Sequence, residues 1–190
     1  MNAEKIIVGL AGMPGSGKSL VVDAATEMGY GVVIMGDVIR EETQKRGLKL
    51  NPKNIGRVML ELRKKGGASV VADRCITKLE QLESEKVIVD GVRSLSEVAT
   101  FEKRFPRFSL MAVYASPETR FNRIYRRQRS DDPERWELFN ERDIRELGVG
   151  LGDVIAMAEY LIVNEEGKGK SNTKVAAKRF IRRIEEKWMK

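Results

Sequence analysis

Short apolar runs alternate along the chain with longer amphipathic stretches. The runs lie at residues 6–8, 32–35, 87–89, 110–114 and 160–163. None of them alternates apolar with polar residues, which is the pattern of a strand with one face in water. Because strands buried on both faces need helices on both sides, the five runs predict an α/β fold with a five-stranded parallel sheet.

Helices are expected in the stretches between these runs. They lie at residues 18–28, 37–46, 52–65, 68–83, 94–104, 117–129, 133–146 and 171–188. Asn51 before Pro52 is typical of an N-cap followed by proline at the first helical position, and Ser94 is a further N-cap. Glycines at positions 29, 47 and 66 mark three helix ends.

The predicted strands are unevenly spaced. About 50 residues separate the second and third runs, and about 45 separate the fourth and fifth. A simple crossover between parallel strands needs far fewer residues. We therefore expect a single domain over residues 1–190, with helical insertions at about residues 38–84 and 126–155 that project from the sheet.

A glycine-rich motif separates the first predicted strand from the first helix. It consists of Gly12, Met13, Pro14, Gly15, Ser16, Gly17, Lys18 and Ser19, and it matches the pattern GxxxxGK[ST]. Its glycines allow unusual backbone angles and bring N–H groups close to phosphate oxygens. The start of the following helix directs its positive dipole end at the same anion.

The side chains of this motif complete a nucleotide site. Lys18 supplies a cation for the β- and γ-phosphates, and the Ser19 hydroxyl is a ligand for Mg²⁺. The motif therefore predicts binding of ATP with Mg²⁺ by residues 12–19 and the adjoining Leu20. The alternative is a glycine-rich turn that binds nothing, which the strand–loop–helix context disfavours.

Charged residues follow the second and third predicted strands. Asp37 and Arg40 come after the second strand, and Asp90 and Arg93 come after the third. Ligands gather beyond the carboxyl ends of parallel strands, so we expect Asp90 to hold Mg²⁺ through water and Asp37 to contact the acceptor or take its proton. Arg40 and Arg93 would bind an acceptor phosphate. The structural alternatives are a helix cap for Asp37, a turn at Asp90 and solvated arginines.

The stretch from residue 120 to residue 129 is dense in arginine. Arg120, Arg123 and Arg127 recur at helical spacing and share a face. Such a face suits a mobile lid that offsets phosphoryl charge and excludes water. Ordinary surface charge is the alternative for some of them. An RNA-binding patch is disfavoured, because aromatic residues for base stacking are sparse there.

Composition narrows the chemistry further. Histidine is absent and cysteine occurs once, at Cys75. These counts exclude an imidazole base, a disulfide within the chain and a Cys-rich zinc site, and they favour a reducing cytoplasm. The 35 Lys and Arg residues exceed the 28 Asp and Glu residues, and the net charge of +7 suits anionic partners such as phosphates.

No membrane segment is expected. The apolar runs are much shorter than the roughly 20 residues of a membrane span. The apolar residues 6–13 are followed by the glycine-rich motif rather than by a cleavage site, which argues against a secretory signal.

The motifs together resemble those of the nucleoside monophosphate kinases, above all the adenylate kinases. The resemblance rests on the glycine-rich motif, Gly36-Asp37-x-x-Arg40, Asp90-Gly91-x-Arg93 and the arginine-rich stretch. The second half, from Pro117 through Arg123 and Arg127 to Asn164, is similar to the dephospho-coenzyme A kinases. Over nearly its full length the chain most resembles an archaeal family of predicted nucleotide kinases.

This resemblance implies a P-loop fold with strand order 2-3-1-4-5, an acceptor-binding insertion at about residues 38–84 and a lid at about residues 126–155. It implies that Arg123 binds the nucleotide near the adenine and that Arg127, with Arg142, acts near the phosphates. It also places Asn164 and the loop that follows it, up to Gly167, beside the adenine.

The predicted activity is transfer of the γ-phosphoryl group of ATP to a small nucleotide-like acceptor. A phosphate acceptor is already ionised and needs no base, so Arg40 and Arg93 would matter most. A hydroxyl acceptor, as in the dephospho-coenzyme A kinases, needs a base, for which Asp37 is the candidate. A slow regulatory NTPase with a macromolecular partner is a further alternative, and a homo-oligomer stays open.

Overall fold

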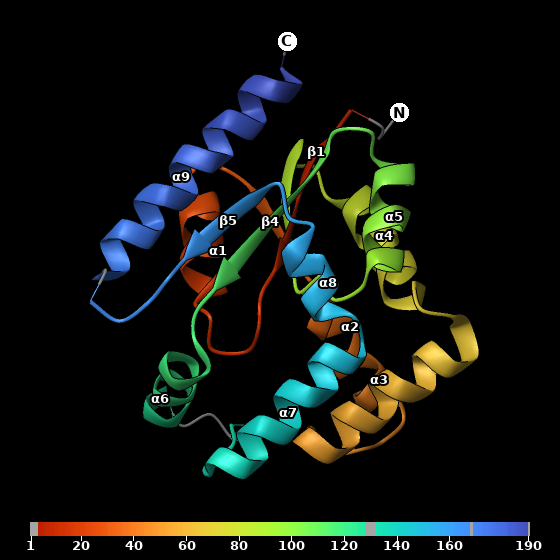
Figure 1. The fold of residues 1–190 in the computed structure, drawn as a ribbon. Helices are drawn as coiled ribbons and strands as arrows, with labels where there is room; N and C mark the ends of the chain where they lie inside the picture. The colour runs from red at the N-terminus through yellow and green to blue at the C-terminus, as the bar shows by residue number, and fades with distance from the viewer. Residues whose placement is uncertain (1–3, 128–131, 168, 190) are drawn as a thin grey trace.

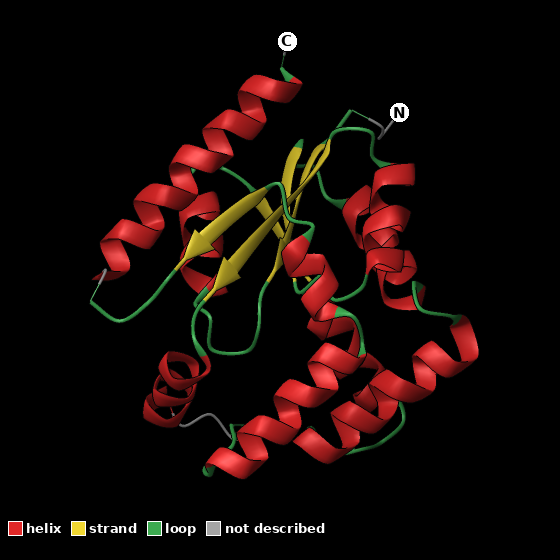
Figure 2. Ribbon diagram, in the orientation of Figure 1, coloured by secondary structure: helices red, strands yellow, loops and turns green. Residues whose placement is uncertain are grey.

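The protein folds around one parallel sheet with helices on both faces (Figures 1 and 2). The computed structural model describes residues 4–127, 132–167 and 169–189. The strands are β1 (Ile6–Ala11), β2 (Gly31–Ile34), β3 (Lys86–Asp90), β4 (Phe108–Tyr114) and β5 (Tyr160–Val163). They lie in the order β2-β3-β1-β4-β5, and every pairing is parallel, so the predicted sheet and its order are confirmed.

The central strand β1 is buried along its whole length. Successive side chains of a strand point to opposite faces, so Ile7 joins one apolar core and Val8 joins the other. This is why the strand reads as a continuous apolar run rather than as an alternating one. Its neighbours β3 and β4 place Val87 and Phe108 opposite Ile7.

Two sets of helices cover the two faces of the sheet (Figure 2). One core is closed by α1 (Lys18–Glu27) and α9 (Gly169–Trp188). The other is closed by α4 (Val70–Gln81), α5 (Leu95–Arg104) and α8 (Leu151–Ala156). Among the described residues no helix combines the length and apolar character that a membrane span requires.

The remaining helices extend past the carboxyl ends of the strands (Figure 1). They are α2 (Met35–Lys45), α3 (Pro52–Gly66), α6 (Pro117–Arg127) and α7 (Trp136–Gly148). Most of α2 and all of α3 fall in the first stretch expected as an insertion, and α7 falls in the second, whereas α6 precedes the second stretch except for its last two residues. The assignment of one stretch to the acceptor and the other to a lid stays a prediction, and residues 128–131 of the expected lid lie outside the described part.

Local signals placed most helix boundaries well. The Asn51 side chain accepts a hydrogen bond from the Asn54 N–H at 2.9 Å, as an N-cap does. Ser94 and Glu97 form a reciprocal capping box at the start of α5. The short helix α8 was not predicted. Gly150, with a positive φ of 106°, ends the preceding helix, and the chain forms a separate helix of six residues after it.

One surface cluster joins the first and last helices. The Glu27 carboxylate on α1 accepts hydrogen bonds from Lys178 and Lys174 on α9, and these lower its pKa from 4.5 to about 2. Because the folded state holds the carboxylate ionised, its contribution to stability is complete above pH 4.5 and is lost as the pH falls towards 2.

We therefore expect Glu27→Gln to lower the urea midpoint of unfolding at pH 6 and to leave it unchanged near pH 2. Glu186→Gln is the matched control, since the described residues form no ion pair with this exposed carboxylate of α9. An equal loss for Glu27→Gln at both pH values would contradict an electrostatic cause.

Candidate nucleotide-binding site

The glycine-rich motif forms a tight loop between β1 and α1. The Ser16 N–H donates to the Met13 carbonyl at 3.1 Å, and Lys18 Nζ donates to the Gly12 carbonyl at 2.7 Å. Gly17 has a φ of 99°, and a Cβ at this position would lie 2.2 Å from Asn164 Nδ2. A side chain at position 17 is therefore excluded by both backbone angle and space.

Asn164 braces the loop from the end of β5. Its side chain is buried, and Nδ2 donates to the Ser16 carbonyl at 2.8 Å. Thr173 Oγ1 donates to Asn164 Oδ1 at 2.9 Å, which holds the amide in one orientation. Arg123 Nη1 also reaches the Ser16 carbonyl, at 3.4 Å. Asn164 thus positions the backbone of the loop that would bind phosphate. The prediction placed Asn164 beside the adenine and did not include its hydrogen bond to Ser16.

Arg120 is a structural residue rather than part of the solvent-facing arginine set. Its Nε donates to the Ala115 carbonyl at 3.1 Å, and Nη1 donates to the Pro14 carbonyl at 3.2 Å. Asp143 of α7 accepts hydrogen bonds from both guanidinium Nη atoms, one of them at 2.8 Å from Nη1. Helical spacing alone could not reveal this, because the first turn of α6 lies against the loop.

A cavity of about 900 Å³, here called the outer cavity, opens beside the loop. Its volume falls within the roughly 300–1,000 Å³ of small-molecule sites. It is lined by Pro14, Gly15, Gly17, Lys18, Ser19, Leu20, Asp90, Arg93, Arg123, Arg126, Arg127, Arg142, Asn164, Glu165, Glu166 and Gly167. The structure thus brings six of the predicted nucleotide-binding residues, 14, 15 and 17–20, together with Arg123, Arg127 and Asn164, whereas Gly12, Met13 and Ser16 are absent from the described lining.

The arginines at the mouth of the outer cavity are anchored by an acidic residue. Arg127 donates to Asp132 through Nε and Nη2, each at 2.7 Å. Arg142 Nη1 lies 3.7 Å from the same carboxylate. Asp132 therefore holds one arginine of α6 beside one of α7, and both line the cavity where the triphosphate is expected.

Lys18 and Asp90 form the charged centre of the site. Burial lowers the pKa of the Lys18 ammonium, and the nearby Asp90 carboxylate opposes that shift. Asp90 is the last residue of β3, and its Oδ1 is buried without a hydrogen-bond partner among the described residues. Asp90 and Ser19 line the same cavity. A carboxylate oxygen and a hydroxyl are donors that fit Mg²⁺ held partly through water, and their role as metal ligands stays a prediction.

A second cavity of about 140 Å³, here called the inner cavity, also includes Lys18 in its lining. It is lined by Gly12, Pro14, Lys18, Ile34, Gly36, Arg40, Asp90, Gly91, Val92, Arg93, Glu146 and Leu151. Two of the three predicted acceptor-binding residues, Arg40 and Arg93, therefore line one cavity, and their acceptor role stays a prediction. Lys18, Asp90 and Arg93 line both cavities.

Asp37 is placed differently from the prediction. Its Oδ1 is 2.5 Å from Arg40 Nη1, and both side chains are 47% exposed. Asp37 lines a separate cavity of about 310 Å³ with Lys78, and it is absent from the described lining of the inner and outer cavities. The reason is that Met35 and Val38 bury the opposite side of α2. Asp90 is the carboxylate that faces the phosphate loop.

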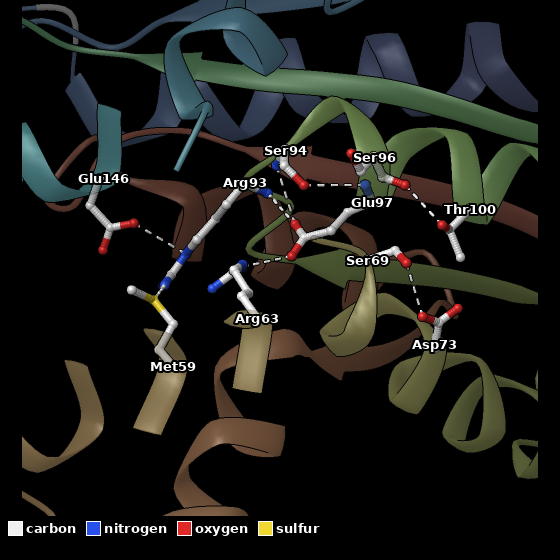
Figure 3. Close-up of polar contacts among 10 residues, drawn as sticks. All are labelled: Met59, Arg63, Ser69, Asp73, Arg93, Ser94, Ser96, Glu97, Thr100 and Glu146. Carbon is white, nitrogen blue, oxygen red and sulfur yellow. Dashed lines mark hydrogen bonds and ion pairs between the residues drawn. The ribbon is translucent and has the colours of Figure 1, made fainter. Parts of the chain in front are cut away.

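Sequence reasoning missed two carboxylates near Arg93 (Figure 3). Glu146 Oε2 lies 3.3 Å from Arg93 Nε. Glu97 is fully buried, accepts from the Arg93 N–H at 2.7 Å and pairs with Arg63 at 2.7 Å. The capping pattern of Ser94 and Glu97 could have indicated the role of Glu97. Nothing in the local sequence links Glu146, on α7, to Arg93.

The fold and the loop together define a P-loop kinase-like domain. Solved structures with this fold include a shikimate kinase from Bacteroides thetaiotaomicron, with a TM-score of 0.64 and 15% identity, covering 95% of this chain and 98% of that one. A gluconokinase from Sinorhizobium meliloti has a TM-score of 0.59 and 14% identity, covering 97% and 95%. At these identities the likeness concerns the fold alone.

Sequence relatives are much closer. The pattern of the AAA domain family matches residues 11–139. A UPF0200 protein from Hyperthermus butylicus is 50% identical over 163 residues, covering 86% of this chain and 87% of the relative. Another, from Methanothermobacter thermautotrophicus, is 44% identical over 182 residues, covering 96% and 92%. The chain belongs to the UPF0200 family.

The buried pair of Arg120 and Asp143 is expected to be critical for stability. Asp143→Asn leaves the guanidinium buried without its counter-charge, so we expect a loss of about 3–5 kcal/mol in the free energy of unfolding. Urea denaturation measures it, with the exposed Glu141→Gln on the same helix as the control. A loss below about 1 kcal/mol for Asp143→Asn would contradict this structural role.

Proposed function

We propose that this protein is an ATP-dependent phosphotransferase that moves the γ-phosphoryl group of ATP to a small nucleotide-like acceptor. The observation that carries the proposal is that Lys18, Asp90 and Arg93 line both the outer and the inner cavity. A donor in one cavity and an acceptor in the other would meet at the same charged residues. Phosphoryl transfer requires this kind of positioning, with the attacking and leaving oxygens in line.

The outer cavity suits the donor. The phosphate loop, with its backbone N–H groups and the start of α1, would bind the polyphosphate. Arg123 and residues 164–167 line the part of the cavity proposed to hold the base. Asp90 and Ser19 would hold Mg²⁺, which supplies charge neutralisation at the β- and γ-phosphates.

The inner cavity suits the acceptor. Arg40 and Arg93 would bind an acceptor phosphate, which is ionised at neutral pH and attacks without a base. Lys18 then offsets charge on the phosphoryl group during transfer, and Arg127 acts from the proposed lid. Closure of that lid would exclude water and so prevent hydrolysis of ATP.

A hydroxyl acceptor is the second candidate. It is favoured by one observation: both predicted acceptor-binding arginines are already paired within the chain, Arg40 with Asp37 and Arg93 with Glu146. A hydroxyl acceptor needs a base, and Asp90 Oδ1, which has no hydrogen-bond partner among the described residues, is an alternative to the exposed Asp37.

Release of ADP, measured with and without a panel of nucleoside monophosphates and dephospho-coenzyme A, tests the activity. We expect at least one acceptor to accelerate release, and Lys18→Met to lower that rate by about 10²–10³ because it removes charge stabilisation at the transferred group. Lys49→Met, an exposed lysine, is the control. Slow release that no acceptor stimulates would support a regulatory NTPase instead, and failure to bind ATP with Mg²⁺ would overturn both.

Asp37→Asn tests whether Asp37 is the base for a hydroxyl acceptor. With a phosphate acceptor, or with Asp90 as the base, we expect the turnover rate to change less than about tenfold, because Asp37 then has no proton to remove. If Asp37 is the base for a hydroxyl acceptor, the rate should fall by about 10²–10⁴. The same assay on Asp73→Asn, an exposed aspartate of α4, controls for loss of a surface carboxylate.

A further inference from the structure

The guanidinium of Arg93 is held between two elements that are far apart in the sequence (Figure 3). Glu146, in the last turn of α7, lies with Oε2 at 3.3 Å from Arg93 Nε. On α3, Met59 Sδ is 3.5 Å from Arg93 Nη1. The Glu146 side chain is only 12% exposed, so this ion pair is less screened by water than a surface pair.

The backbone of Arg93 is anchored independently of Glu146. Its N–H donates to Glu97 Oε2 at 2.7 Å, and the Ser94 N–H donates to the same oxygen at 3.2 Å. Glu97 is itself fixed by Arg63 Nη2 at 2.7 Å from its other oxygen. Arg93 is therefore tied to β3 and α5, whereas Glu146 comes from a helix beyond the strand ends. Of the two charged partners, Glu146 is the one that can leave without breaking the capping box.

Glu146 brings a negative charge to the position where an anionic acceptor would need a positive one. The inner cavity is lined by Lys18, Arg40 and Arg93, and also by Asp90 and Glu146. Lys18 is also part of the phosphate loop, and Arg40 is paired with Asp37. Arg93 is thus the cation of this cavity whose charge Glu146 directly offsets.

We propose that Glu146 is a specificity-determining residue of the inner cavity, whose carboxylate is a built-in competitor for the anionic group of the acceptor at Arg93. That this anionic group is the phosphate of an acceptor rests on the proposed function. An incoming phosphate monoester takes the place of the Glu146 carboxylate at Arg93. The phosphate carries two negative charges and can bind the guanidinium through two oxygens, whereas Glu146 makes one contact at 3.3 Å.

This exchange has two consequences for selection. Competition with Glu146 lowers the affinity of every anion that binds Arg93 by the same factor, so it sets a threshold of absolute affinity rather than a preference between two phosphates. Inorganic phosphate relies on this contact and falls below the threshold, whereas an acceptor that carries its phosphate on a larger organic group has further contacts that keep it above. The inner cavity, at about 140 Å³, is below the roughly 300 Å³ of most small-molecule sites, and Glu146 is part of its lining, so withdrawal of that side chain would leave more room for the acceptor.

The test measures anion binding without turnover. Inorganic phosphate is titrated into the full-length protein saturated with Mg²⁺ and a non-hydrolysable ATP analogue, and ³¹P NMR reports its dissociation constant. We expect Glu146→Gln to bind phosphate about five- to tenfold more tightly than the wild type. Glu141→Gln, an exposed carboxylate on the same helix, should bind phosphate as the wild type does.

A double-mutant cycle assigns the effect to Arg93. In an Arg93→Gln background, Glu146→Gln should give no gain in phosphate affinity. If Glu146→Gln folds poorly, Glu146→Asp keeps the charge but retracts it from Arg93, and a smaller gain is expected. Unchanged or weaker phosphate binding in both Glu146 variants, or a gain that persists without Arg93, would overturn the proposal.

The result is separable from the proposed function. If no acceptor stimulates ADP release but Glu146→Gln still tightens phosphate binding through Arg93, the competitor role stands and the kinase proposal fails. If an acceptor stimulates ADP release while Glu146→Gln leaves phosphate binding unchanged, the kinase proposal stands and the competitor role fails.

Discussion

The phosphate loop depends on a backbone path that leaves no room for side chains at Gly15 and Gly17. A Cβ at position 15 would lie 2.7 Å from the Arg120 carbonyl, and one at position 17 would lie 2.2 Å from Asn164 Nδ2. The same two contacts show what holds the loop in place: α6 on one side and the end of β5 on the other. The sheet edge, the loop and the two buried braces therefore form one unit, and each cavity is shaped around it.

Some arginines of this protein stabilise the fold through buried ion pairs, and others line the outer cavity. Arg120 is buried against Asp143, and Arg63 is paired with the buried Glu97. Arg123 and Arg127 instead line the outer cavity. Burial of this kind changes what an arginine can do, because the Nε and both Nη atoms of Arg120 already donate to carbonyls or a carboxylate inside the fold. A count of positive residues overstates the charge available to a substrate.

The carboxylates near the site also differ in which groups they contact. Asp90, at the end of β3, faces Lys18 and keeps one oxygen unpartnered among the described residues. Asp37 lies on the exposed side of α2, and Glu146 arrives from α7 to neutralise Arg93. Their positions relative to the strand ends, rather than their residue type, separate the proposed metal ligand, the surface ion pair and the proposed competitor for an anion.

The sheet, its strands, most helix starts and the phosphate loop follow from patterns that can be read along the chain. These features are local: apolar runs, caps and glycines act over a few residues, and the chirality of parallel crossovers limits how such strands connect. The tertiary structure alone decided that Arg120 is buried, that Asn164 braces Ser16 and that Glu146 reaches Arg93. Each of these contacts joins residues at least 23 positions apart, and such contacts depend on how helices pack over the strand ends, which no local pattern encodes.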